Sequence, residues 1–139
     1  MRADLDEFIT QQHLSRKEGE AVLSRLEYAS SVDEAARQAD LVIEAVPDEL
    51  ESKLEIFTLL DKVCRPATIL ATTAQTLSVT EIASITFRRD RCIGMRFVFG
   101  DRILRLELVS GNESSRQTLT ACERVARKLA KELVIVSDR

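Results

Sequence analysis

Residues 39–53 read ADLVIEAVPDELESK, and this stretch decides the fold. The run 41–45 is typical of a strand buried on both faces, and Pro47 and Asp48 turn the chain into a helix with an acidic start. In open α/β sheets, ligands bind at the carboxyl ends of the strands, because a helix N-terminus there offers free backbone N–H groups and the positive end of its dipole. A binding site is therefore predicted between Ala45 and Lys53.

A second strand-to-helix edge follows in residues 67–77, which read ATILATTAQTL. An apolar strand leads into a polar turn of Thr, Ala and Gln, and the sequence SVTEIASI of residues 78–85 then predicts a short helix. The two edges are predicted to line one crevice.

The rest of the pattern alternates helices with strands. Residues 49–64 predict a long amphipathic helix, and a helix at 114–131 is predicted to be built on Leu119, Cys122, Val125 and Leu129. Strands are predicted at 68–72, 91–97, 104–109 and 133–136, with a short strand at 26–29 and a brief helix from Ser31 or Asp33 to Arg37. This alternation favours a largely parallel α/β sheet.

The N-terminal residues predict a helical hairpin ahead of the sheet. Leu5, Phe8 and Ile9 recur at helical spacing. Residues 15–18 read SRKE, which has the form of a capping box at the start of a second helix.

The length and charge of the chain limit the classes of protein to which it can belong. A chain of 139 residues that is 45% hydrophobic can bury a substantial core, so a single domain over residues 1–139 is predicted. The net charge of −3 is spread over interspersed charges, without the basic stripe that binds nucleic acid. No apolar run has the length of a membrane span, and the N-terminus is too polar for a signal peptide. We therefore expect no nucleic-acid or membrane partner, and a cytoplasmic location.

The three cysteines, Cys64, Cys92 and Cys122, are odd in number and widely spaced among apolar neighbours. This pattern is typical of reduced, buried thiols rather than of disulfides or metal ligands. No metal site is predicted.

Several of these segments resemble the NAD-binding domain of the 3-hydroxyacyl-CoA dehydrogenase family. The resemblance lies in DLVIEA at 40–45 with Asp48 and Lys53, and in TTAQTL at 72–77. It continues through RDRCIGMRF at 89–97 and LRLELV at 104–109 to VSDR at 136–139. The resemblance implies a Rossmann-like, doubly wound sheet, NAD as cofactor, an acyl-CoA-like ligand and a role in fatty acid metabolism.

The chain departs from such domains in its glycines. A dinucleotide fold normally carries G-x-G-x-x-G after its first strand, because only glycine lets the backbone approach the pyrophosphate closely. The four glycines here are Gly19, Gly94, Gly100 and Gly111, and no two are two residues apart. We therefore predict an incomplete Rossmann-like sheet that lacks the first β-α-β half, and the resemblance implies that the family's C-terminal helical domain is absent too.

The family's catalytic positions are substituted. The resemblance places Arg96 where the family has a general-base histidine, Glu107 at its orienting glutamate and Gln75 at its catalytic serine, while Phe99-Gly100 replaces an asparagine-proline. Arginine stays protonated and cannot accept a proton, although it can bind a carbonyl or phosphate. The ordinary alternative for Arg96 and Glu107 is an ion pair on neighbouring strands.

The cofactor positions match better. The resemblance implies cofactor contacts from Ala45, Asp48, Lys53 and Thr73, with Asp48 and Lys53 facing the nicotinamide ribose. The ordinary alternatives are that Asp48 caps the helix and that Lys53 is solvated. Glu44, at the end of a buried strand, is interpreted as a hydrogen-bonded structural residue.

Three functional hypotheses follow. The first is an NAD-dependent 3-hydroxyacyl-CoA dehydrogenase that is weak or inactive as this chain alone. The second is a non-catalytic module that binds an anionic ligand between Asp48, Gln75 and Arg96. The third is a chain that forms a homo-oligomer or pairs with another protein to complete its sheet, because the missing strands would expose a hydrophobic edge.

Overall fold

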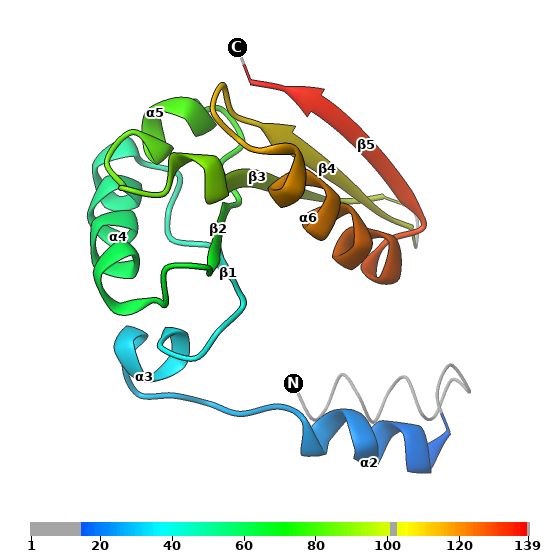
Figure 1. Ribbon diagram of the computed structural model, residues 1–139. Helices are drawn as coiled ribbons and strands as arrows, with labels where there is room; N and C mark the ends of the chain where they lie inside the picture. Colours follow the sequence, from blue (N-terminus) through cyan, green and yellow to red (C-terminus); the bar gives the residue numbers. More distant parts are fainter. Residues whose placement is uncertain (1–14, 101–102, 139) are drawn as a thin grey trace. The chain divides into compact units, whose positions relative to one another are not determined.

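The computed structural model describes residues 15–100 and 103–138, and the chain divides into two compact units, residues 1–31 and 32–139 (Figure 1). In the first unit, α2 spans Arg16–Ser24, and the Ser15 hydroxyl accepts a hydrogen bond from the Glu18 N–H at 3.0 Å. The predicted N-cap is therefore confirmed. The first helix of the predicted hairpin lies outside the described residues.

The second unit is built on one five-stranded sheet. Its strands are β1 (Leu41–Glu44), β2 (Ile69–Thr72), β3 (Cys92–Phe99), β4 (Leu104–Ser110) and β5 (Glu132–Ser137), which lie in the order β1-β2-β3-β4-β5. The β3–β4 pair is antiparallel and the other three pairs are parallel. The predicted α/β class with a largely parallel sheet is confirmed.

The helices of this unit are α3 (Val32–Ala36), α4 (Leu50–Val63), α5 (Val79–Ala83) and α6 (Arg116–Leu129), with a 3₁₀ turn η1 (Arg89–Arg91). Ser78 and Ser115 cap α5 and α6, since each hydroxyl accepts from the backbone N–H three residues on, at 3.1 Å. Such caps satisfy N–H groups that the helix itself leaves free. The two caps therefore fix the residues at which α5 and α6 begin.

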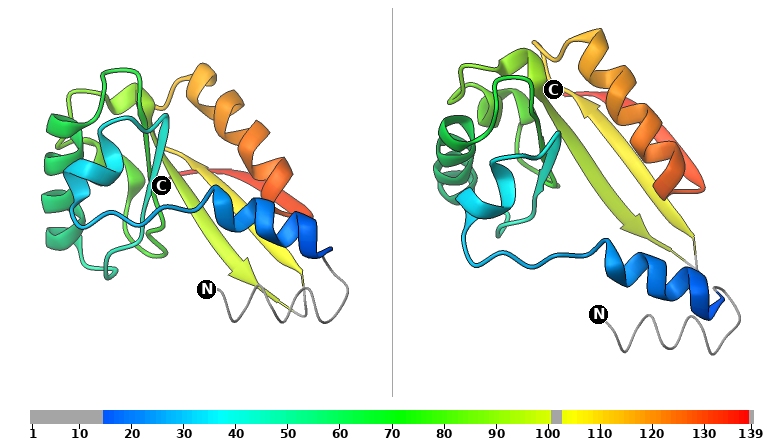
Figure 2. Two further views of the ribbon diagram at one scale, coloured as in Figure 1. Left: turned by 90° about the horizontal axis from the view of Figure 1, so that it is seen from below. Right: turned by 60° about the horizontal axis from the view of Figure 1, so that its bottom comes forward.

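Alternating side chains of the strands build a core on each face of the sheet. Leu70 and Cys92 pack beneath α4 and α5, in what we call the α4/α5 cluster. Ala71 and Ile93 point the opposite way and pack with Cys122 of α6, in the α6 cluster. Figure 2 shows α6 running along the strands β3 to β5.

Three local predictions are wrong. Residues 26–29 form no strand, and Leu26 instead donates its N–H to the Leu23 carbonyl at 3.2 Å, in the turn that follows α2. β1 is not buried on both faces: it lies at the edge of the sheet and Ile43 is 38% exposed. In α6 the prediction is right for Cys122, which is buried, and for Leu119, which packs against the α6 cluster, but wrong for Leu129, which is 50% exposed.

Gly94 of β3 is required by close packing. A Cβ at this position would lie 2.8 Å from both Val109 Cβ and Val79 Cγ2, in the layer between β4 and α5. Gly94→Ala is therefore expected to lower the free energy of unfolding by about 1–3 kcal/mol, measured by urea denaturation. Gly100→Ala is the matched control, because among the described residues its added methyl would meet only Ile103 O, at 4.0 Å. Equal denaturation midpoints for the two variants would contradict the prediction.

Candidate functional site

The carboxyl ends of β1 and β2 meet through Asp48. Its Oδ2 accepts hydrogen bonds from the Gln75 N–H at 3.4 Å and from the Thr76 hydroxyl at 3.3 Å. The two strand-to-helix edges therefore form one rim, as predicted. Asp48 is not the cap of α4, because Glu49 occupies the N-cap position.

Lys53 lies beneath this rim, buried rather than solvated. Its side chain is 1% exposed, and Nζ donates to Glu44 Oε1 at 3.0 Å, to Glu44 Oε2 at 3.1 Å and to the Val46 carbonyl at 3.2 Å. The ordinary alternative of a solvated lysine is therefore wrong. All three ammonium protons have partners inside the protein, so Lys53 positions the turn that carries Asp48.

Glu44 is the structural residue that the sequence indicated. It is 4% exposed and accepts hydrogen bonds from the Val46 N–H at 3.0 Å and from the Thr72 hydroxyl as well as from Lys53. The carboxylate thus joins the ends of β1 and β2 to the first turns of α4.

Ala45 and Thr73 lie at the same edge. Thr73 donates its N–H to the Glu44 carbonyl at 3.2 Å, and its own carbonyl accepts from Gln75 Nε2 at 3.2 Å. Ala45 follows β1 and is exposed, and Thr73 is half-buried. Ala45, Asp48 and Thr73 therefore lie along the edge where a cofactor contact was predicted, whereas Lys53 lies behind it.

A pocket of about 520 Å³ adjoins the rim and brings together the three residues predicted to be catalytic, Gln75, Arg96 and Glu107. Arg96 and Glu107 are Cα partners across the antiparallel β3–β4 pair, so both side chains lie on one face. The neighbours Met95, Leu106 and Leu108 point into the core on the other face.

Arg96 and Glu107 do not form the ion pair of the ordinary alternative. Within the described residues, no salt bridge joins them: Arg96 Nε donates to the Ala74 carbonyl at 2.9 Å, and Glu107 contacts Arg105 at 3.4 Å. The Gln75 turn, through Ala74, therefore holds Arg96. The pocket contains a cation and a carboxylate that are not bonded to each other.

Asp138 is a pocket residue that sequence reasoning did not assign. Its Oδ2 accepts from the Ser78 hydroxyl at 2.8 Å and from the Thr80 N–H at 2.7 Å. Partial burial acts to raise the pKa of this carboxyl, but hydrogen bonds from Thr80, Ser78 and Val79 outweigh it and hold the pKa below its usual value. Asp138 follows β5, which runs antiparallel to β1 and β2, so the strand-end argument gave no signal for it.

The cysteines are free and buried, as predicted. Burial raises the pKa of Cys92 to about 11 and that of Cys122 to about 11, and it also raises the pKa of Cys64. The thiols stay protonated at neutral pH and are poor nucleophiles. No cluster of three or more metal-ligating side chains, and no helix able to span a membrane, occurs among residues 15–100 and 103–138.

Comparison with known proteins identifies the family of the chain. The family described as "3-hydroxyacyl-CoA dehydrogenase, NAD binding domain" matches residues 1–139. A probable 3-hydroxybutyryl-CoA dehydrogenase of Bacillus subtilis is 37% identical over 122 residues, which cover 87% of this chain and 42% of that protein. A 3-hydroxybutyryl-CoA dehydrogenase of Clostridioides difficile is 39% identical over 106 residues, or 76% of this chain and 38% of that protein.

Solved structures give the same answer for the fold. The (S)-3-hydroxybutyryl-CoA dehydrogenase of Ralstonia eutropha superposes with a TM-score of 0.90 at 28% identity, covering 99% of this chain and 48% of that one. The sheet is therefore that of the Rossmann-like dehydrogenases, as predicted. The chain spans less than half the length of these relatives. It belongs to the 3-hydroxyacyl-CoA dehydrogenase family, whose NAD-binding domain it matches over its whole length.

Proposed function

We propose that this chain binds the nicotinamide half of NAD along the rim of β1 and β2, and that the adjoining pocket holds a 3-hydroxyacyl-CoA for oxidation. One observation carries the proposal. The Asp48 carboxylate is bonded to the Gln75–Thr76 turn, which also lines the pocket that contains Arg96 and Glu107. Cofactor rim and substrate pocket are therefore parts of one continuous site.

The residues present fit one half of the cofactor. Ala45, Asp48 and Thr73 offer a carboxylate, a hydroxyl and backbone groups to a ribose at the strand ends. The sequence has no glycine-rich turn for the pyrophosphate, because Gly19, Gly94, Gly100 and Gly111 stand apart. We therefore propose weak NAD binding and weak or absent turnover for this chain alone.

Bound NAD would supply the hydride acceptor, and the chain supplies orientation and charge. Arg96 stays protonated, so it can hold a carbonyl oxygen but not remove a proton. Titration of the purified chain with NADH, followed by nicotinamide fluorescence, tests the proposal. Saturable binding supports it, and a folded chain that shows none would contradict it.

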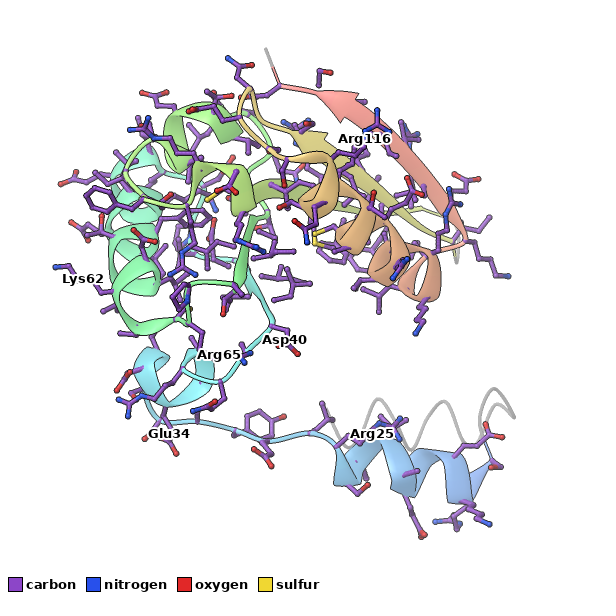
Figure 3. All side chains as sticks on the ribbon, in the orientation of Figure 1. Arg25, Glu34, Asp40, Lys62, Arg65 and Arg116 are labelled. Atoms are coloured by element: carbon purple, nitrogen blue, oxygen red, sulfur yellow. The ribbon has the colours of Figure 1, made fainter. Side chains whose placement is uncertain are left out.

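Asp48→Ala is expected to weaken NADH binding several-fold, because it removes the carboxylate of the rim and releases the Gln75 turn. Fluorescence titration measures the change. Asp40→Ala is the matched control: Asp40 lies at the other end of β1, where its exposed side chain pairs with Arg65 at 2.6 Å (Figure 3). Equal affinities for the two variants would remove the cofactor assignment.

A second candidate function is binding without catalysis. The observation that favours it is Arg96 itself, whose Nε is held by Ala74 at a position where the family has a base. This candidate predicts that acyl-CoA or another phosphate-bearing anion binds while hydride transfer to NAD is absent. Binding and turnover measured on the same preparation distinguish the two functions.

We also propose that the edge of β1 pairs with a strand of a second copy of the chain. β1 ends the sheet, and an apolar groove of about 360 Å³ beside it is lined by Val32, Leu41, Ile43 and Ile56 among others. An open apolar edge invites strand addition, and an edge lysine blocks it. Sedimentation velocity is expected to give a dimer for the wild type and a monomer for Ile43→Lys. A monomeric wild type would contradict the proposal.

A further inference from the structure

The pocket beside the rim contains one carboxylate, that of Glu107, with only a long contact to the rest of the described structure. Two of its lining residues carry carboxylates, Asp138 and Glu107. Asp138 is occupied as the acceptor for Ser78 and Thr80 at the start of α5, at 2.8 and 2.7 Å. Among the described residues, the one partner of Glu107 is Arg105 Nη2, at the long distance of 3.4 Å.

The other polar groups of the pocket cannot accept a proton at neutral pH. Arg96 is permanently protonated, and the Gln75 amide is not basic. The remaining polar side chains that line the pocket are the hydroxyls of Thr76, Ser78 and Ser137, which are weak bases as well. Among the lining residues, Glu107 is therefore the proton acceptor with the weakest existing contact.

Glu107 also lies beside a hydrogen-bond donor, Arg96. The β3–β4 register sets its Cα opposite that of Arg96, and the bond from Arg96 Nε to the Ala74 carbonyl at 2.9 Å fixes the guanidinium without using its terminal nitrogens. A hydrogen-bond donor and an acceptor thus face one pocket side by side. A 3-hydroxyacyl group presents the complementary pair, a hydroxyl that donates and a thioester carbonyl that accepts.

We infer that Glu107 accepts the proton of the substrate's 3-hydroxyl group and that Arg96 donates to the acyl carbonyl. The inference rests on the proposed function and deepens it, because it assigns the family's proton-accepting role to a different residue. The O–H bond breaks and its proton passes to a Glu107 carboxylate oxygen, while the C3–O bond becomes a carbonyl. Bound oxidised NAD would accept the electron pair of the C3–H bond as hydride and so would serve as the oxidant.

A test without turnover compares the binding of 3-hydroxybutyryl-CoA and acetoacetyl-CoA by isothermal titration calorimetry. A carboxylate accepts a hydrogen bond from the hydroxyl but faces the keto oxygen with like charge. Wild-type protein is therefore expected to bind the hydroxy compound about tenfold more tightly, the effect of one charged hydrogen bond. Glu107→Gln is expected to lose or reverse this preference, because its amide N–H can donate to the keto oxygen.

Two further variants separate this role from a structural one. Glu107→Asp keeps the carboxylate and is expected to keep the preference. Glu132→Gln removes an exposed carboxylate from β5 and is also expected to keep it. The inference is overturned if Glu107→Gln retains the wild-type preference, or if the wild type binds both compounds equally or binds neither.

NADH titration of the same preparation keeps the two proposals apart. NADH binding without a hydroxy preference overturns the role of Glu107 and leaves the cofactor rim standing. A hydroxy preference without NADH binding supports the contact with Glu107 and overturns the cofactor function.

Discussion

Replacing Lys53 with methionine is expected to lower the free energy of unfolding by about 3–5 kcal/mol, because the Glu44 carboxylate would remain buried without its cation. The two side chains are 1% and 2% exposed, and the Lys53 ammonium lies 3.0 and 3.1 Å from the two carboxylate oxygens. A domain of this size is stable by only about 5–15 kcal/mol, so the loss is a large share of the total. Urea denaturation followed by circular dichroism measures it.

Lys62→Met is the matched control for this prediction. Lys62 lies on the same helix with its side chain exposed to solvent (Figure 3), so its loss is expected to change the stability by less than about 0.5 kcal/mol. The double variant Glu44→Gln/Lys53→Met is expected to recover most of the loss, because it leaves no unpaired charge in the core. A double variant no more stable than Lys53→Met would show that the cost lies in packing rather than in charge.

Arg88→Met is expected to destabilise the fold by a similar amount, about 3–5 kcal/mol, because one buried guanidinium satisfies several groups at once. Arg88 Nε pairs with Asp61 Oδ1 at 2.7 Å. Its terminal nitrogens donate to the carbonyls of Asp61, Cys64, Arg65 and Thr68. The side chain thus closes the C-terminal end of α4 and fixes the loop that leads into β2.

Arg88→Lys tests whether geometry or charge matters. A lysine brings the charge but only three donors from one nitrogen, so it is expected to recover only part of the stability. Arg89→Met is the control, since Arg89 is half exposed and its contact with Glu113 is 3.8 Å long. Urea denaturation measures the free energy of unfolding of all three variants. If Arg89→Met lost as much stability as Arg88→Met, the structural role assigned to Arg88 would be contradicted.

The contrast between Arg88 and Arg89 shows why part of the structure could not be predicted. Short apolar runs located the five strands of the sheet, and apolar residues at helical spacing located α4 and α6. For two adjacent arginines, the sequence carries no signal that tells which side chain is buried. The role of Arg88 depends on carbonyls 20 to 27 residues earlier in the chain, which only the folded structure brings into reach.

Part of the candidate site could also be predicted, because the ends of the strands could be located in the sequence. Strand-end chemistry placed Asp48, Thr73 and Gln75 at one edge, and the β3–β4 register then set Arg96 beside Glu107. The sequence left Lys53 as a cofactor contact or a solvated helix residue, because its buried partner, Glu44, comes from the preceding strand. No role was predicted for Asp138, because the residues that donate hydrogen bonds to it, Ser78 and Thr80, lie about sixty positions away in the sequence.

The three buried thiols can be used to measure local unfolding of the protein. Cys64 and Cys92 belong to the α4/α5 cluster and Cys122 to the α6 cluster, so each face of the sheet contains a sulfur that solvent cannot reach in the closed state. Thiol reagents need access and a thiolate, so each residue can be labelled only when its own layer opens. Mass spectrometry of the labelled peptides would therefore time the loosening of each layer separately, in the unmodified chain and without an added probe.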